Sequence, residues 1–341
     1  MDHNKPLFVA EISANHLGDL SRARDLVHAA IDSGANAVKL QTYTASTMTI
    51  DVDLPEFKIS SDHKLWGGRG LFELYQEAHT PWEWHEELFD ICKSAGVIPF
   101  STPFDLTAVD FLEKIDTPIY KISSMETGDH ELIDKVARTG KPLIISTGAT
   151  HWSEIVELVE VVRKAGNENL TLLVCTSSYP ADPKDAHLNR MLRLKEEFGC
   201  NVGVSDHTLG IGVSIAGIAL GASVVERHFT LKRSDGGADA AFSLEPNEFQ
   251  ELVKEGNRAF NSLGNATWSV QDAEYESRRI RRSLFVVEDV KAGESVTKMN
   301  VRPIRPGDGC APRLLPGMLG KKFRNAVVKG TPMSPDLVYD K

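Results

Sequence analysis

The sequence predicts an α/β protein whose larger part is a (β/α)8 barrel and whose C-terminal part is a small β-rich domain. Between Leu7 and Gly264, short uninterrupted apolar segments alternate with amphipathic helical segments, a pattern typical of parallel strands buried on both faces. Eight such units in one domain favour a closed barrel over an open sheet. The chain has 341 residues, enough for a barrel of about 250 residues and a second domain.

The expected strands and helices can be placed by residue. Strands are expected at Leu7–Ile12, Ala37–Leu40, Val97–Phe100, Pro118–Ile122, Pro142–Ile145, Leu170–Val174, Val202–Val204 and Ala222–Val225. Helices are expected at Leu20–Ser33, Pro81–Ala95, Thr107–Lys114, Glu131–Arg138, Ser153–Lys164, Ala186–Phe198, Gly212–Leu220 and Pro246–Leu263. Thr80 before Pro81 indicates an N-cap and a first-turn proline. Glycines at positions 34, 96, 140 and 166 indicate helix ends.

The connection after the second expected strand is unusually long, from Tyr43 to Thr80. Connections of this length inside a compact domain are usually functional or disordered. This one contains Phe57, Trp66, Phe72 and Tyr75. We therefore expect an ordered segment that covers the mouth of the barrel.

The character of the chain changes after Gly264. We expect the barrel to span residues 1–264, a linker to span 265–282 and the second domain to span 283–341. The linker is charged and ends in Arg278-Arg279-Ile280-Arg281-Arg282, which we interpret as a solvated face. A domain of about 58 residues buries a marginal core, so it is expected to dock on another surface.

Composition excludes several classes of protein. Hydrophobic residues make up 41% of the chain, which is too many for a disordered protein. The net charge of −10 and the pI of about 5.6 argue against a nucleic-acid partner. Cys92, Cys175, Cys200 and Cys310 are widely spaced and indicate a reducing compartment. No signal peptide or membrane-spanning run is apparent, so we expect a cytoplasmic protein with no membrane partner.

Two histidines follow the last two expected strands. His207 comes just after Val202–Val204, and His228 comes just after Ala222–Val225. If these strands are parallel neighbours, both histidines emerge at the carboxyl edge of the sheet, where α/β proteins place their chemistry. A lone histidine is more often a core or loop residue. Two imidazoles side by side are suited to a divalent metal ion such as Mn, Fe or Zn.

Lysines and hydroxyl residues also lie on or after the strands. Lys39 and Lys121 are costly to bury unless they meet anions. The hydroxyl residues are Thr102, Ser124, Ser146, Ser177 and Ser205. Together the two kinds of side chain can bind a phosphate and a carboxylate. A lysine Schiff base is the less favoured alternative, and each hydroxyl alone is equally typical of a turn.

Carboxylate and amide side chains complete the set. Glu11, Gln41 and Glu126 follow strands and can bind sugar hydroxyls or transfer protons. Salt bridges to the barrel lysines are the alternative for the two carboxylates. Asp239 lies in a glycine-rich loop after the last expected strand, and its proximity to the histidines makes it a further candidate.

Eight motifs in this order resemble those of a known family. They are AEISANHLGDL, VKLQTY, FSTPFD, YKISSME, ISTGA, CTSSYP, VSDHTLG and ERHFTLKRSDGGADAAFS. They resemble the nonulosonate (sialic acid) synthases, which condense phosphoenolpyruvate (PEP) with an N-acylated amino sugar. The C-terminal domain is similar to the antifreeze-like (SAF) domain of that family, on Asn300-Val301-Arg302 and Arg305-Pro306-Gly307. The resemblance covers nearly the whole chain.

The resemblance implies a role for each candidate residue. The implied metal ligands are His207 and His228, for a divalent cation such as Mn²⁺, with Mg²⁺ or Co²⁺ as alternatives. The implied PEP contacts are Lys39, Thr102, Lys121, Ser124, Ser146, Ser177 and Ser205. The implied sugar contacts are Glu11, Gln41, Glu126, Tyr179, Asp239 and Arg305, the last reaching across a domain-swapped homodimer. Catalytic roles are implied for Glu126, Glu11, His207 and Lys121. Glu126 is the first candidate for proton transfer.

Two positions depart from the family pattern. Ser177 stands where the sialic acid branch usually carries Asn, and Ser13 stands where the family usually carries Gly. We expect the change at Ser13 to be tolerated.

Within the family, two stretches are most similar to the pseudaminic acid synthase branch. They are Leu65–Phe89 and GGADAAFSLEP. The substrate of that branch is 2,4-diacetamido-2,4,6-trideoxy-L-altrose. This sugar is less polar than N-acetylmannosamine, so an aromatic and Leu-rich cover is suited to it. Synthesis of N-acetylneuraminate or legionaminate is the alternative within the family.

Two alternatives lie outside the family. The first is a barrel enzyme that makes 3-deoxy-sugar phosphates, but a cysteine metal ligand near the first motif is missing and the SAF-like domain is present. The second is a non-catalytic carbohydrate-binding protein, which the intact set of lysines, carboxylates and histidines disfavours.

Overall fold

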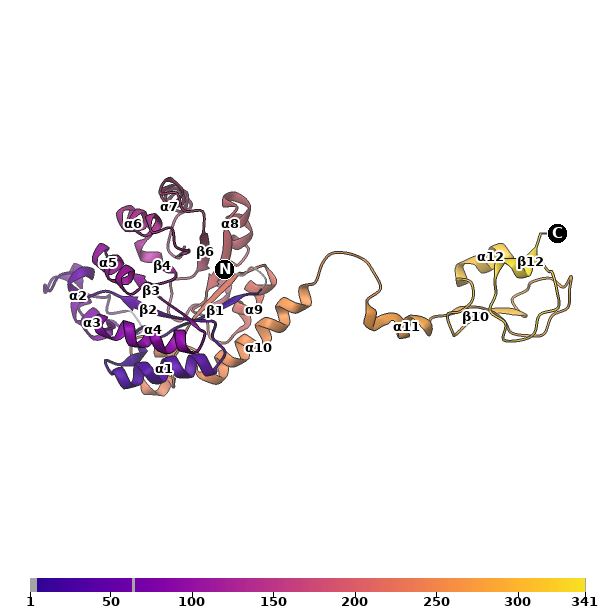
Figure 1. Cartoon of the computed structure of the whole chain (residues 1–341), viewed down its shortest axis with the longest axis horizontal. Helices are drawn as coiled ribbons and strands as arrows, with labels where there is room; N and C mark the ends of the chain where they lie inside the picture. The colour runs from indigo at the N-terminus through magenta and orange to yellow at the C-terminus, as the bar shows by residue number, and fades with distance from the viewer. Residues whose placement is uncertain (1–4, 63–64, 341) are drawn as a thin grey trace. The chain divides into compact units, whose positions relative to one another are not determined.

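The structure is a computed structural model that describes residues 5–62 and 65–340. Eight parallel strands close into a barrel in the order β1 to β8, with β8 pairing back onto β1 (Figure 1). The strands are β1 (Leu7–Glu11), β2 (Ala37–Thr42), β3 (Ile98–Pro103), β4 (Tyr120–Ile122), β5 (Leu143–Ser146), β6 (Leu170–Cys175), β7 (Asn201–Ser205) and β8 (Val224–His228). The predicted (β/α)8 TIM-barrel fold is confirmed.

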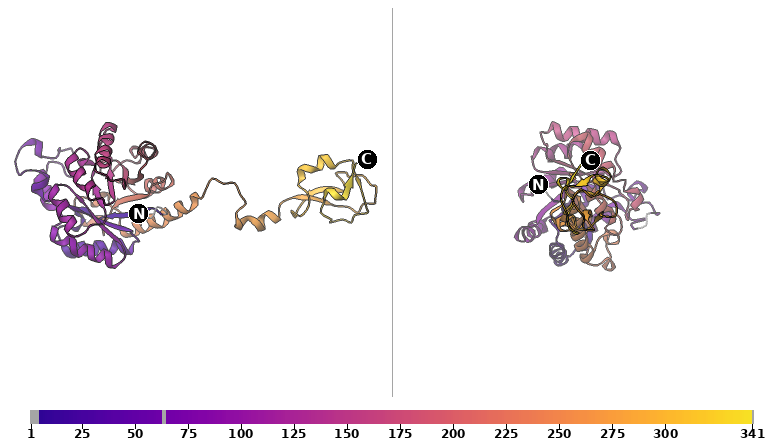
Figure 2. Two further views of the ribbon diagram at one scale, coloured as in Figure 1. Left: turned by 45° about the horizontal axis from the view of Figure 1, so that its top comes forward. Right: turned by 90° about the vertical axis from the view of Figure 1, so that its right-hand side faces the viewer.

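Helices surround the barrel on the outside (Figures 1 and 2). They are α1 (Leu20–Asp32), α4 (His85–Ser94), α5 (Leu106–Lys114), α6 (His130–Arg138), α7 (Trp152–Lys164), α8 (Arg190–Phe198), α9 (Gly212–Ala219) and α10 (Pro246–Leu263). The glycines expected at the ends of α1, α4, α6 and α7 all have positive φ, between 70° and 86°, the conformation that ends a helix.

Two details of the expected helices are wrong. The helix expected from Ala186 begins only at Arg190. The chain after Thr80 forms a 3₁₀ turn, Trp82–Trp84, before α4. Thr80 does not cap this turn, because its hydroxyl contacts the His16 ring nitrogen at 3.2 Å. A tertiary hydrogen bond therefore replaces the local one that the sequence suggested.

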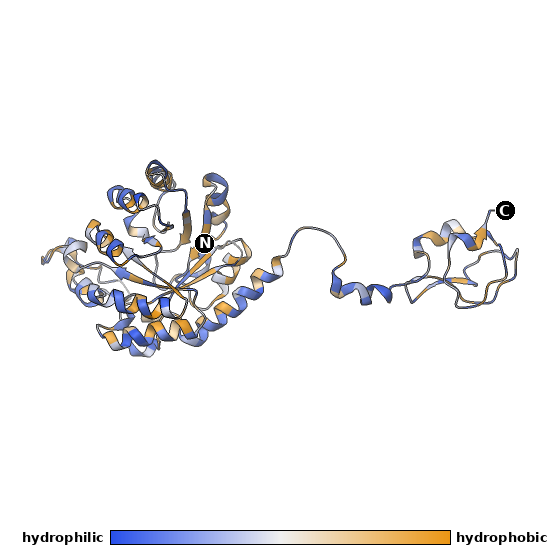
Figure 3. Ribbon diagram, viewed as in Figure 1, coloured by the Kyte–Doolittle hydropathy of each residue, from blue (hydrophilic) through white to orange (hydrophobic). Residues whose placement is uncertain are grey.

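Apolar packing occurs in two layers. One cluster fills the barrel and includes Val9, Phe100 and Leu173. A larger cluster lies between the strands and the helices, and the outer helices carry both hydrophobic and hydrophilic residues (Figure 3). This burial stabilises the barrel and fixes the ends of the strands.

The long connection is ordered over its described residues. We call residues 43–80 the β2–α4 segment; residues 63 and 64 lie outside the described residues. It contains α2 (Ala45–Met48), a 3₁₀ turn (Pro55–Phe57) and α3 (Leu71–Ala78). The backbone N–H of Ile59 donates to the carbonyl of Arg69 at 2.9 Å, which joins the two arms of the segment.

The chain divides into two compact units, residues 1–264 and 265–341. The second unit contains α11 (Tyr275–Arg279), α12 (Leu315–Met318) and two antiparallel pairs, β9 (Ser283–Val286) with β10 (Val301–Ile304) and β11 (Lys322–Phe323) with β12 (Val338–Tyr339). Its core includes Leu284, Val296 and Phe323. Residues expected to form the solvated linker are mostly exposed, although the carbonyl of Arg279 accepts a hydrogen bond from Gly307 at 2.8 Å.

Within the described residues, the helices are all too short or too polar to cross a lipid bilayer.

Candidate active site

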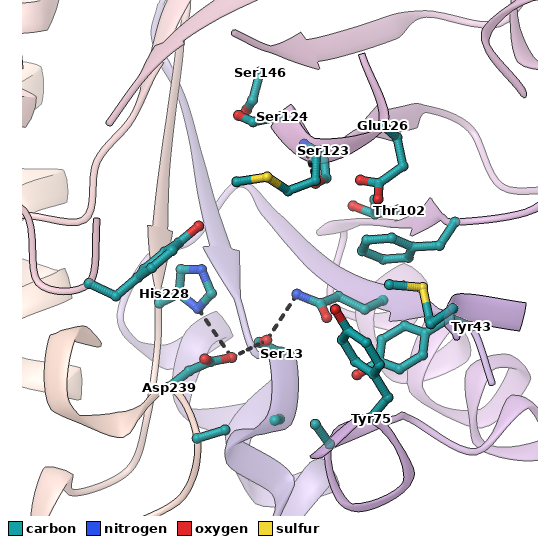
Figure 4. A pocket seen from close by; sticks show the side chains of 18 of the residues that line it. Ser13, Tyr43, Tyr75, Thr102, Ser123, Ser124, Glu126, Ser146, His228 and Asp239 are labelled. Carbon is teal, nitrogen blue, oxygen red and sulfur yellow. Dashed lines mark hydrogen bonds and ion pairs between the residues drawn. The ribbon is translucent and has the colours of Figure 1, made fainter. Parts of the chain in front are cut away.

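A cavity of about 440 Å³ lies at the carboxyl ends of the barrel strands (Figure 4). Most of the side chains selected from the sequence line it. They are Lys39, Gln41, Thr102, Lys121, Ser124, Glu126, Ser146, Tyr179, Ser205, His207, His228 and Asp239. Because all the strands of the barrel are parallel, their carboxyl ends meet at one mouth of the barrel. This explains why these side chains lie around one cavity.

The floor of the cavity is a network of buried charges. The Lys39 ammonium lies 2.5 Å from a Glu11 carboxylate oxygen, and 3.8 Å from Glu226. Lys121 lies 4.0 Å from the other Glu226 oxygen, which also accepts a hydrogen bond from the Ser205 hydroxyl at 3.0 Å. All four ionisable side chains are buried. Each charge therefore depends on its partners, because an unpaired buried charge is costly.

These neighbours shift the pKa values in opposite directions. Burial raises the pKa of Glu11 to about 7, although Lys39 opposes this. Burial works against ionisation of Glu226, but Lys121 and Lys39 outweigh it and hold the Glu226 pKa below its usual value. Burial lowers the pKa of Lys121, and Glu226 offsets only part of this. Two carboxylates on adjacent strands thus differ in their readiness to hold a proton.

Hydroxyl groups gather beside Lys121. The backbone N–H of Gly148 donates to the Ser124 hydroxyl at 2.9 Å. A side chain at Gly148 would come within 2.4 Å of the Ser177 hydroxyl, so only glycine leaves room for this cluster. The Ser146 hydroxyl is buried without a hydrogen-bond partner among the described residues. An anion near Lys121 would supply that partner.

The two histidines meet at adjacent strand ends, as predicted. β7 and β8 are parallel neighbours, and the ring centroids of His207 and His228 are 5.3 Å apart. His207 Nδ1 lies 3.0 Å from the Thr176 carbonyl, so this nitrogen carries the proton in the neutral ring and Nε2 keeps a free lone pair. His228 Nδ1 is buried without a hydrogen-bond partner among the described residues. Burial holds the pKa of His228 well below its usual value.

Two imidazoles at adjacent strand ends fit a divalent metal ion when their ring nitrogens are deprotonated. Asp239 approaches them, with one carboxylate oxygen 3.8 Å from His228 Nδ1. Among the residues that the structure describes, however, no three His, Cys, Asp or Glu side chains form a complete metal cluster. A cation held here would therefore need water or substrate as further ligands.

A chain of hydrogen bonds joins the β2 and β8 sides of the cavity. The Gln41 amide donates to the Ser13 hydroxyl at 2.9 Å, and the Ser13 hydroxyl donates to Asp239 (Figure 4). Ser13 has φ of 40°, a conformation that glycine adopts more easily. The Ser13 hydroxyl is used at this position, since it holds Asp239.

The β2–α4 segment forms the apolar wall of the cavity. Its lining side chains are Tyr43, Met48, Ile59, Trp66, Leu71, Leu74, Tyr75 and Ala78. As expected, the segment is ordered at the barrel mouth, and its aromatic residues Trp66 and Tyr75 line the cavity. Phe57 and Phe72 are not among the cavity-lining residues that the structure describes.

Three of the candidate site residues do not line the cavity. Glu11 is fully buried beneath it and reaches it through Lys39. Ser177 lies near the cluster around Gly148. Arg305 belongs to the second unit and is exposed.

Sequence reasoning missed Glu226 as a site residue. It pairs with both barrel lysines and lines the cavity. A signal was present, since Glu226 stands two residues before His228 on one strand and so shares its face. Cys175, the last residue of β6, was also not selected as a site residue, although it lines the cavity. Its sulfur lies 3.8 Å from His207 Nδ1.

Comparison with known proteins places this site in a family. The model of the NeuB family matches residues 26–267. The chain belongs to the NeuB family. This NeuB-family chain is 41% identical over 332 residues to the pseudaminic acid synthase of Helicobacter pylori, with 97% of each sequence covered. It is 35% identical over 321 residues to the N,N'-diacetyllegionaminic acid synthase of Campylobacter jejuni, with 93% of this chain and 95% of the relative covered.

A solved structure agrees with this assignment. The N-acetylneuraminic acid (sialic acid) synthetase from Leptospira borgpetersenii matches with a TM-score of 0.72 and 30% identity. The match covers 81% of this chain and 90% of that one. The expected class, an enzyme of the nonulosonate synthase type, is confirmed for this NeuB-family chain.

The raised pKa of Glu11 predicts a pH dependence of stability. The folded value of about 7 lies above the 4.5 of an ordinary glutamate, so the unfolded chain releases this proton first. Stability should therefore fall by about 3 kcal/mol as the pH rises from about 4.5 to about 7. Glu11→Gln should flatten this part of the profile in urea unfolding at several pH values. The exposed Glu131→Gln is the control, and equal slopes in wild type and Glu11→Gln would contradict the assignment.

Proposed function

We propose that the protein is a pseudaminic acid synthase. It condenses PEP and water with 2,4-diacetamido-2,4,6-trideoxy-L-altrose and releases pseudaminate and phosphate. The proposal rests mainly on one observation, namely that the cavity of this NeuB-family barrel has a polar side and an apolar side. One side offers lysines and hydroxyls, and the other offers the apolar wall of the β2–α4 segment. The greater identity to the Helicobacter pylori relative than to the Campylobacter jejuni one supports the choice of branch.

The polar side is suited to PEP. Lys121 and the hydroxyls of Ser124 and Ser146 would bind its phosphate, with Ser205 nearby, while Ser177 does not line the cavity. Lys39, which contacts the Thr102 hydroxyl at 3.1 Å, would bind its carboxylate. Ammonium and hydroxyl donors stabilise the charge on phosphate as it leaves.

The apolar side is suited to a sugar with few hydroxyls. The deoxygenated C6 and the two acetamido methyls of the altrose would face residues such as Leu74 and Ile59. Gln41, Glu126, Tyr179 and Asp239 would bind its polar groups. N-acetylneuraminate or legionaminate synthesis is the alternative, and it would keep the same polar side with a different fit to this wall.

The reaction proceeds by cleavage of the C–O bond of PEP. C3 of PEP forms a bond to the open-chain aldehyde carbon, whose oxygen takes a proton. Water adds at C2 with loss of a proton and gives a tetrahedral phosphate hemiketal. The bond from C2 to the phosphate oxygen then breaks, phosphate leaves with the bonding electrons, and the C2 hydroxyl releases its proton and becomes the ketone carbonyl. Burial raises the pKa of Glu126, which suits this residue to hold the proton that the aldehyde oxygen takes. Glu11 is the second candidate.

His207 and His228 would hold a divalent cation, Mn²⁺ in the first instance, with Mg²⁺ or Co²⁺ as alternatives. A bound cation would supply Lewis-acid polarisation of the aldehyde oxygen. The Thr176 carbonyl would keep the His207 ring in the tautomer that this role requires.

We propose that the second unit acts as the SAF domain of a domain-swapped homodimer. Its exposed Arg305 would reach the sugar in the barrel of the other subunit. A small core such as that around Leu284 and Phe323 gains stability from docking on a larger surface. We propose a cytoplasmic location, where PEP is available.

The sugar is tested by phosphate release from PEP with Mn²⁺. We expect the diacetamido-trideoxy-altrose to exceed N-acetylmannosamine and the legionaminate precursor by at least about tenfold in kcat/KM, because polar groups of the wrong sugar would meet the apolar wall. Preference for another sugar would overturn the branch and leave the reaction type in place. No release with any of the three would contradict the catalytic proposal.

The metal role is tested by His207→Ala. Loss of one of two imidazole ligands should lower phosphate release by at least about a hundredfold in Mn²⁺-replete buffer. Equilibrium dialysis should show weaker Mn²⁺ binding. The exposed His151→Ala is the control and should keep wild-type turnover. Full turnover by His207→Ala with metal present would exclude this role.

The domain-swapped dimer is tested by complementation. Arg305→Ala and Lys121→Met should each be nearly inactive alone. Co-expressed, they should recover about a quarter of wild-type activity, since half of the dimers would be mixed and each would contain one intact site. If both single variants are inactive and co-expression recovers nothing, Arg305 serves its own barrel, whereas full activity of Arg305→Ala alone would exclude a role in the site.

A further inference from the structure

Trp66 joins parts of the site that are far apart in the sequence. Its indole N–H donates a hydrogen bond to the carbonyl of Ala238 at 2.9 Å. Its ring also lies against Tyr179, with the centroids 5.8 Å apart. Trp66 belongs to the β2–α4 segment, whereas Ala238 belongs to the loop that follows β8. One side chain thus contacts the loops that follow β6 and β8.

The backbone of the loop to which Trp66 binds is intrinsically flexible. Gly236 and Gly237 directly precede Ala238 and have φ of 77° and 110°. A side chain at Gly237 would lie 2.6 Å from Leu17, so the turn requires glycine there. Glycine loses more conformational entropy on ordering than any other residue. The position of this turn therefore depends on contacts at its two ends.

One end of the turn is held by an ion pair, and the other by Trp66 together with the Ser243 hydroxyl, which donates to the Asp239 carbonyl at 2.7 Å. Asp235 lies 2.8 Å from the Arg22 guanidinium. At the other end, Ala238 accepts the indole hydrogen bond, and the next residue is Asp239. Movement of the Ala238 carbonyl would move Asp239 with it, because the two share a peptide bond.

The hydrogen bond between Trp66 and Ala238 affects the site through Asp239. Its carboxylate accepts a hydrogen bond from Ser13 and lies 3.8 Å from His228 Nδ1 (Figure 4). The contact of Trp66 with Tyr179 leads to the second histidine, since the Tyr179 ring lies 4.6 Å from the His207 ring, centroid to centroid. These two contacts of Trp66 therefore lead to residues that lie beside a histidine.

We propose that Trp66 is a positioning residue for the reaction, whose indole N–H holds the turn 236–238 so that Asp239 faces Ser13 and His228. The proposal rests on the proposed function, in which Asp239 binds the sugar. It gives the β2–α4 segment a second role besides its apolar wall. Substitution of Trp66 acts on the chemistry through Asp239, without direct contact between the indole N–H and the reacting atoms.

The experiment compares Trp66→Phe with Trp152→Phe in the full-length protein. Phe keeps a six-membered aromatic ring at position 66 but lacks the indole N–H donor and the five-membered ring of tryptophan. Trp152 is a matched control because it stacks on Phe198, at 5.4 Å between centroids, and does not line the cavity. Three quantities are measured: amide hydrogen exchange of residues 235–242, the melting temperature, and kcat and KM for PEP and for the sugar.

The expected result is specific to Trp66→Phe. Exchange of residues 235–242 should accelerate at least about fivefold, and kcat should fall about tenfold with little change in the KM for PEP. The melting temperature should stay close to that of Trp152→Phe. The double variant Trp66→Phe/Asp239→Asn should be hardly slower than Asp239→Asn, because both changes act through one carboxylate.

Other results would overturn the proposal. Unchanged exchange of residues 235–242 in Trp66→Phe would exclude a role for the indole in holding the turn. Equal losses of kcat and melting temperature in both single variants would reduce Trp66 to a general structural residue. If the wild-type protein turned over none of the tested sugars, the proposed function would fail, while the exchange comparison would still decide whether Trp66 holds the turn.

Discussion

The pairing of β1 with β8 is the constraint on which the site depends. It closes the barrel and sets Glu11 opposite His228 in the register. Without closure, the first and last motifs of the barrel would lie at opposite edges of a sheet. With it, Lys39 on β2 lies within 4 Å of carboxylates from β1 and β8. The charged floor of the cavity is therefore a product of the whole barrel and of no single βα unit.

Alternate side chains of β8 lie on opposite faces of the strand and have different roles in the site. Glu226 and His228 face the cavity, while Arg227 between them is fully buried on the other side. Arg227 donates to the Asp206 carboxylate at 2.6 Å and also to the carbonyls of Thr208 and Gly210. It thereby fixes the loop that carries His207. Removal of either partner of this buried ion pair would leave an uncompensated buried charge, which is strongly destabilising.

Rigid strands and longer loops supply different halves of the cavity. The lysines, Glu226 and the histidines stand on or directly after strands, where neighbouring strands hold the backbone. The apolar wall comes from the β2–α4 segment, which is free to vary without disturbing the barrel. A common reaction with different sugars is what such an arrangement allows. In the proposed function, the strand ends would supply the chemistry and the loops would set the fit to the sugar.

The sequence by itself determined the barrel and many of the polar side chains that line the cavity. Alternating apolar and amphipathic segments are local signals, and a residue at the end of a parallel strand has one edge to occupy, so Lys39, Lys121 and His207 could be placed in advance. Tertiary structure decided what local patterns do not encode. Thr80 bonds to His16 rather than capping a helix, and Trp66 holds Ala238, a residue far along the chain. Glu226 acquires its role only from lysines on two other strands. Hydrogen bonds and ion pairs between distant segments depend on their positions in space, and those positions exist only after the barrel has closed.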